Sequence, residues 1–232
     1  MASPKPDSPS PEALQRISQV LTPEYGLLMA SLGASWSASL VRTSIFLAIL
    51  GAAGVALGFA AQTGVDSPTF RTLALVVLPV VLFLGIATFV RLVQVQRESI
   101  VIITGLNRIR HVFQLAVPEA RPYYVLPAHD DIYGLYRSPG TGMPRRLPRF
   151  QLVYLVVQTQ GVVGLVNGVV AGAIAALALE PFVPGALLLV GFVAFILTVA
   201  ATFLYWQHEI SELSAALRPI NPTPPDEIDA PI

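Results

Sequence analysis

Cysteine is absent from the 232-residue chain, and charged residues make up only 12% of it. Without cysteine the protein forms no disulfide, no thiolate nucleophile and no cysteine-ligated metal site. Lys5 is the only lysine among 14 basic residues, a usage typical of a GC-rich bacterial genome. The net charge is zero and the basic residues are few, so we expect no nucleic-acid partner.

Ionisable side chains are also missing from the interiors of four long apolar runs. These runs are about Leu40–Ala61, about Leu73–Val93, Leu152–Leu179 and Phe182–Trp206. Proton pumps, voltage sensors and most ion-coupled transporters place ionisable groups inside their spans. Their absence counts against those classes and leaves open a passive pore or a carrier of neutral solutes.

Apolar residues are abundant instead, at 54% of the chain. As a helix rising about 1.5 Å per residue, Leu152–Leu179 would exceed the ~30 Å hydrocarbon core of a bilayer. The last run ends on Tyr205-Trp206, an aromatic pair expected at a membrane–water boundary. We therefore predict an all-α integral membrane protein whose four transmembrane helices form two helical hairpins with cytoplasmic helical extensions.

Local signals refine the helix boundaries. Ser10-Pro11-Glu12 and Thr22-Pro23-Glu24 each resemble a helix start, with a cap residue, a proline and an acid. Pro79 is expected to bend the second span. Helical spacing then continues over Arg97–Leu115, and the last helix should continue to about Leu217. The apolar face of the first extension comprises Ile100, Ile103, Leu106, Ile109 and Phe113.

These signals divide the chain into a series of segments. They are a disordered N-terminal tail (1–10), cytoplasmic or juxtamembrane helices (11–37), the first hairpin (38–93), a cytoplasmic helix and loop (94–149), the second hairpin (150–206), a cytoplasmic helix (207–218) and a disordered tail (219–232). The last assignment depends on the proline-rich, acidic composition after Pro219.

Basic residues predict the orientation, because they accumulate on the cytoplasmic side of a membrane. The two expected hairpin links contain only Arg71 as a basic residue. Both termini should therefore be cytoplasmic, in a multi-pass protein of the plasma membrane. Arg145, Arg146 and Arg149 precede the third span, where they are expected to bind lipid phosphates and anchor the topology. A specific site for an anionic lipid or ligand is the alternative.

Small residues recur along two spans at intervals of four. Gly164, Gly168 and Gly172 form one stripe, and Gly54 and Gly58 form a shorter one. Such faces let helix backbones approach closely in lipid, either within one chain or between chains. Asn167 flanks the first stripe and needs a hydrogen-bond partner, for which Thr198 and Thr202 are candidates.

An enzymatic hypothesis depends on His129-Asp130-Asp131. With His111, His208, Glu209 and Glu212 on the same side of the membrane, these residues could bind a metal that activates water. No specific metal or nucleophile motif accompanies them. An Asp in a loop more often forms a turn or caps a helix.

The leading prediction is a non-enzymatic membrane protein, without a cofactor, that contacts lipids and associates with itself or with a membrane protein partner. The association would use the glycine faces and the cytoplasmic segment. The first alternative is a pore or carrier for a small solute, lined by Asn167, Thr198 and Thr202. The second is a metal-dependent hydrolase at the membrane interface.

Overall fold

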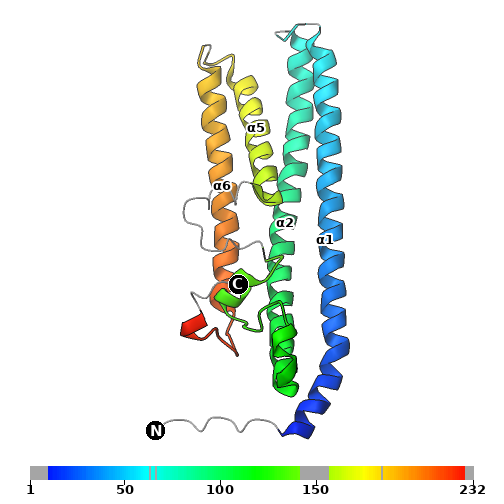
Figure 1. Ribbon diagram of the computed structural model, residues 1–232. Coiled ribbons are helices and arrows are strands. Elements are labelled where there is room, and N and C mark those ends of the chain that lie inside the picture. The colour runs from blue at the N-terminus through cyan, green and yellow to red at the C-terminus, as the bar shows by residue number, and fades with distance from the viewer. Residues whose placement is uncertain (1–9, 63, 66, 142–156, 184, 228–232) are drawn as a thin grey trace. The chain divides into compact units, whose positions relative to one another are not determined.

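Four long helices dominate the computed structural model, which describes residues 10–62, 64–65, 67–141, 157–183 and 185–227. They are α1 (Pro11–Ala61), α2 (Pro68–Ala116), α5 (Thr159–Leu179) and α6 (Leu187–Ala216), as Figure 1 shows. The shorter elements are η1 (Pro118–Tyr123), α3 (Ile132–Arg137) and η2 (Pro225–Glu227). The described residues contain no strand, in agreement with the all-helical prediction.

Each of the four long helices is long and apolar enough to cross a membrane. Their surfaces carry large apolar side chains: Phe59 is 66% exposed, Phe83 70% and Leu188 92%. In water a surface of this kind promotes association, whereas lipid hydrocarbon solvates it. The length and the composition of the helices are those of a multi-pass membrane protein.

Helix α1 begins at Pro11, as expected, but the second helix start expected at Thr22-Pro23 is wrong. The helix runs through Pro23 without a break. The Thr22 hydroxyl donates a hydrogen bond to the Ser18 carbonyl inside the helix (2.8 Å), so it does not cap a new one. In Figure 1 the dark-blue first turns of α1 diverge from the turns that follow, a bend of the kind that proline produces.

The two predicted helical extensions are confirmed. Helix α2 passes through Pro79 and ends at Ala116, and α6 passes through Trp206 and ends at Ala216. The apolar face predicted for the α2 extension is confirmed for four of its five residues, which are at most 6% exposed: Ile100, Ile103, Leu106 and Ile109. The fifth, Phe113, is only partly buried.

The chain forms two compact units. The first, the polar unit, comprises Met1–Ser35, Glu98–Arg145 and Ser214–Ile232. The second, the apolar unit, comprises Trp36–Arg97 and Arg146–Leu213.

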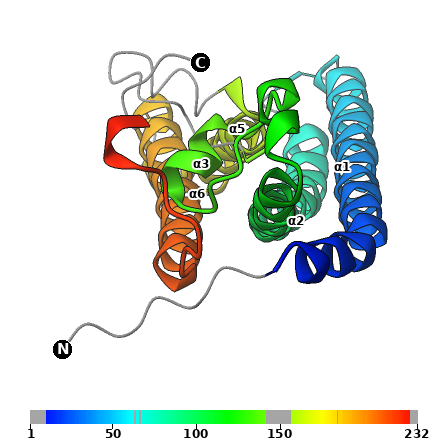
Figure 2. The same ribbon diagram turned by 60° about the horizontal axis from the view of Figure 1, so that its bottom comes forward.

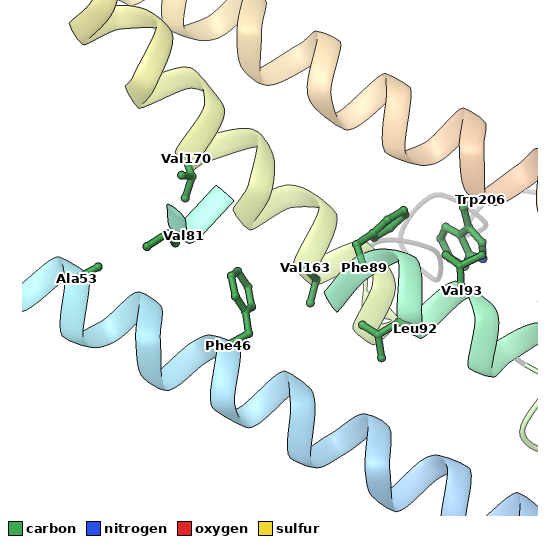
Figure 3. Packing of buried hydrophobic residues seen from close by; sticks show 9 residues of the cluster. All are labelled: Phe46, Ala53, Val81, Phe89, Leu92, Val93, Val163, Val170 and Trp206. Carbon is green, nitrogen blue, oxygen red and sulfur yellow. The ribbon is translucent and has the colours of Figure 1, made fainter. Parts of the chain in front are cut away.

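Side chains from all four long helices form the core of the apolar unit (Figure 3). Phe46 of α1 points toward Val163 of α5, while Phe89 of α2 lies beside Trp206 of α6. The Trp206 indole also donates a hydrogen bond to Gln96 (2.7 Å). Apolar packing therefore dominates this unit, with few buried polar contacts.

Candidate functional site

The densest set of polar contacts in the described chain lies in the polar unit, around the loop that precedes α3. Helix α2 holds this loop through Asn107, whose amide donates to the His129 carbonyl (2.8 Å) and to the Ser138 hydroxyl (3.1 Å). Arg110 donates to the Pro127 carbonyl and to the Asn107 side-chain oxygen (2.8 Å). Asn107 and Arg110 are at most 4% exposed, so the polar face of α2 fixes the loop from inside the unit.

Asp130 is the buried anion of this loop, only 1% exposed. Its carboxylate accepts hydrogen bonds from the backbone N–H groups of Ile220 (2.9 Å) and Asn221 (2.8 Å) and from the Arg108 guanidinium (2.6 Å). Burial by itself would raise the pKa of Asp130, but these donors and the Arg108 charge hold it below its ordinary value. Asp130 is therefore ionised at neutral pH and anchors the segment after α6.

Asp131 connects the same segment to α3. Its side chain caps that helix by accepting from the Gly134 N–H (2.9 Å). It also accepts from the backbone N–H of Thr223 (2.9 Å) and from the Thr223 hydroxyl (2.7 Å). Gly134 is required here, because an added Cβ would lie 2.0 Å from the His129 carbonyl oxygen.

Asn221 contributes a side-chain amide that faces three acceptors. Its Nδ2 lies 2.9 Å from His111 Nδ1, 3.1 Å from the Ala128 carbonyl oxygen and 3.3 Å from His129 Nδ1. A carbonyl oxygen only accepts, so the Ala128 contact identifies the facing atom as the amide nitrogen. His111 Nδ1, the nearest of the three, must then accept and carry no proton.

The pKa of His111 is lowered from 6.5, because burial and the neighbouring His129 and Arg121 disfavour its charged form. Asp130 opposes this shift. The neutral ring that Asn221 requires is thus also the form that the surroundings favour.

Both ends of the segment are held as well. His129 Nε2 lies 3.2 Å from a Glu227 carboxylate oxygen, and Arg137 donates to the Glu227 carbonyl (2.6 Å). Arg108 donates to the Arg218 carbonyl (2.8 Å). Figure 2 shows this red C-terminal segment beside the green loop and α3. We call residues 218–227 the C-terminal tail; its fixed conformation differs from the disorder expected after Pro219.

The candidate catalytic residues therefore meet the tail. Asp130 and Asp131 bind its backbone, while His111 and His129 contact its Asn221 side chain. Among the described residues, no three His, Cys, Asp or Glu side chains are arranged to hold a metal ion. His208 and Glu212 form an exposed pair with each other (3.3 Å) on α6.

The glycine stripe of α5 faces α6 inside the same chain. A Cβ added to Gly168 would lie 2.7 Å from a Val199 methyl carbon, and one added to Gly172 would lie 2.7 Å from the Gly191 carbonyl oxygen. A Cβ added to Gly164 would lie 3.4 Å from the Thr202 hydroxyl oxygen. The close approach that this spacing predicts is thus made within one chain.

The glycines of α1 lie in a different environment. A Cβ added to Gly54 or Gly58 would have no atom within 4 Å. The three arginines expected to anchor the topology, Arg145, Arg146 and Arg149, lie outside the described residues.

Asn167 does not meet its expected threonine partners. The Thr202 hydroxyl bonds to the Thr198 and Val199 carbonyls of its own helix (2.9 Å each). The Asn167 side chain is fully buried, and neither of its polar atoms has a hydrogen-bond partner among the described residues. It faces α2, where a Cβ added to Gly85 would lie 1.9 Å from Asn167 Oδ1.

The sequence did not single out several other polar contacts. Arg71 in the first turn of α2 donates to the Leu177 carbonyl at the end of α5 (2.9 Å) and pairs with Glu180 (3.4 Å). Arg97 pairs with Glu209. These contacts join residues far apart in sequence. The only signal for them in the sequence is the presence of the charged side chains, which does not indicate how they pair.

A groove of about 290 Å³ lies between α5 and α6. Its almost entirely apolar lining includes Gly161, Leu165, Ile196, Phe203 and Trp206. Gln160 and Thr202 are the polar residues of its lining, which contains no ionisable side chain.

No family model, curated protein or solved structure matches this chain. The class of protein therefore follows from the fold: an all-helical chain with four helices that are long and apolar enough to cross a membrane.

Proposed function

We propose that this chain is a non-enzymatic, multi-pass protein of the plasma membrane that assembles with copies of itself through the open glycine face of α1. In this proposal the four spans form two hairpins, and both termini are cytoplasmic. The observation that carries it is the open space beside Gly54 and Gly58, in a molecule whose other glycine stripe is already covered by α6.

Helix packing in lipid supports this use of the face. Lipid tails are as apolar as leucine, so helices associate in a bilayer through close van der Waals contact more than through the hydrophobic effect. Gly54 and Gly58 lie on one side of α1, one turn apart, and both are exposed. A second α1 helix could approach this face at backbone distance.

The polar contacts are consistent with a structural role for the candidate catalytic residues. Asp130 and Asp131 satisfy backbone N–H groups, and Asp131 caps α3. The pore alternative needs Asn167 and Thr202 on one water-filled path. Asn167 faces Gly85 instead, and the Thr202 hydroxyl bonds to its own helix.

The test is native mass spectrometry of the Gly54→Leu/Gly58→Leu variant, released from mild detergent. The matched control is Ala52→Leu/Ala56→Leu, because both alanines are exposed and each lies two residues before a glycine, on the opposite side of α1. We expect an oligomer for the wild type and the control and a monomer for the glycine variant. A monomeric wild type, or an equal effect of both variants, would refute the proposal.

A further inference from the structure

The C-terminal tail is held as a peptide ligand is held. Its backbone donates from Ile220, Asn221 and Thr223 to the carboxylates of Asp130 and Asp131. Its carbonyl groups accept in turn: Arg108 donates to that of Arg218 and Arg137 to that of Glu227. The Asp130 N–H donates to the carbonyl of Asn221. The site thus contacts both the donor and the acceptor groups of the tail backbone.

Two tail side chains add sequence selectivity. The Asn221 amide is surrounded by His111, His129 and the Ala128 carbonyl, and the Thr223 hydroxyl donates to Asp131. Pro222, between them, restricts the conformations of the unbound chain and so lowers the entropy lost on binding. These contacts make the site selective for the Asn221-Pro222-Thr223 sequence.

Little apolar burial holds the tail in place. Thr223 is its only buried residue among 218–227, and Ile220 is 74% exposed. Its attachment depends mainly on hydrogen bonds to the Asp130 and Asp131 carboxylates. Its covalent link to α6 adds an effective concentration in the millimolar range. A segment attached in this way opens more readily than packed helices do.

We propose that Asp130, Asp131, His111 and His129 form a peptide-recognition site that holds the tail as an exchangeable ligand, which the tail of a second copy can replace. Exchange costs little contact energy, because the incoming tail makes the same hydrogen bonds as the one it displaces. The residues between Ala216, where α6 ends, and Ile220 would serve as the hinge. The inference does not depend on the α1 glycine face.

The first experiment uses a fluorescent peptide of residues 216–227 and full-length protein carrying Asn221→Ala/Thr223→Val, which loosens the tail and leaves the site intact. We expect the peptide to bind this variant at least tenfold more tightly than the wild type, whose own tail competes with it. The matched control peptide carries the same two substitutions and should not bind. Equal binding of the two peptides, or none by either, would refute the proposal.

Two further measurements check that the substitutions loosen the tail and that the peptide binds at the proposed site. Hydrogen exchange should show faster exchange in the tail of the loosened variant; an unchanged rate would contradict the assigned roles of Asn221 and Thr223. Adding Asp131→Asn to the loosened variant should weaken peptide binding at least tenfold, while α5 and α6 keep their exchange protection. Retained binding would contradict the site.

Exchange between copies is tested in the Gly54→Leu/Gly58→Leu background, where the glycine face cannot contribute. A chain with Asp130→Asn/Asp131→Asn and an intact tail should co-purify with a differently tagged chain that carries the loosened tail. Co-purification should disappear when an excess of the 216–227 peptide is added. Peptide binding without co-purification would show a site used only within one chain and would overturn the exchange. If the α1 glycine face does not mediate assembly, the peptide-binding and co-purification results remain as expected, so the two proposals can fail independently.

Discussion

His111 is the residue whose protonation opposes tail binding most directly. Its Nδ1 must be unprotonated to accept from Asn221, and its pKa lies below 6.5 in the folded protein. The folded state therefore holds fewer protons at His111 than the unfolded state does. The contribution of neutral His111 to the free energy of unfolding is complete above pH 6.5 and is lost as the pH falls below that value. A protonated Nδ1 also cannot accept from Asn221.

We predict that the tail amides exchange faster at pH 5.5 than at pH 7.5, after correction for the intrinsic rates. Of the charged groups that face His111, His129 and Arg121 add to the effect and Asp130 opposes it. His111→Gln keeps an acceptor without a titration and should flatten the profile. An unchanged profile in that variant would assign the effect to another group.

Asp130 shows how a residue's role follows from its partners. A histidine and two aspartates in sequence are compatible with a metal site, a turn or a helix cap. The contact that decides among these for Asp130 comes from Ile220, 90 residues further along the chain. The structural role expected for an Asp in a loop, a helix cap, is confirmed for Asp131 by the hydrogen bond that it accepts from the Gly134 N–H.

At the scale of elements, the contact between α2 and α5 depends on a glycine opposite an amide. A methyl group at Gly85 would overlap the Asn167 side chain, which is fully buried. We predict that Gly85→Ala lowers the unfolding free energy by about 1–3 kcal/mol, the usual cost of overpacking. Thermal unfolding in detergent measures it.

Asn167→Ala should rescue much of that loss, because it removes both the clash and an unsatisfied buried amide. Gly51→Ala is the matched control, since a Cβ added there meets no atom within 4 Å. It should be neutral or slightly stabilising, as alanine favours a helix more than glycine does. Additive effects of the Gly85 and Asn167 substitutions would contradict the assigned contact.

Element types could be predicted better than element boundaries. Apolar length and helical spacing identified α5, α6 and the extension of α2, because these signals are local in sequence. The helix start assigned to Thr22-Pro23 was wrong, because the same cap-and-proline pattern is compatible with a bent helix interior. The Thr22 hydroxyl bonds backward to Ser18, an outcome that the pattern does not specify.

At the scale of the molecule, the proposed orientation can be tested with single cysteines, because the natural chain has none. We predict that a membrane-impermeant maleimide labels Gln62→Cys in intact cells and Glu119→Cys only after permeabilisation. Both residues are exposed, the first in the link after α1 and the second in η1. The cysteine-free parent gives the background, and the reverse pattern would overturn the orientation.

The sequence by itself determined that the protein is helical and that its long helices are apolar enough for lipid, because both properties follow from local composition and spacing. It also marked the small residues through which helices approach. Only the tertiary structure decided which partners these features have: α6 covers the α5 stripe, Asn167 faces Gly85, and the tail occupies the His-Asp-Asp loop. Such contacts join residues distant in sequence, and their geometry depends on the folded backbone.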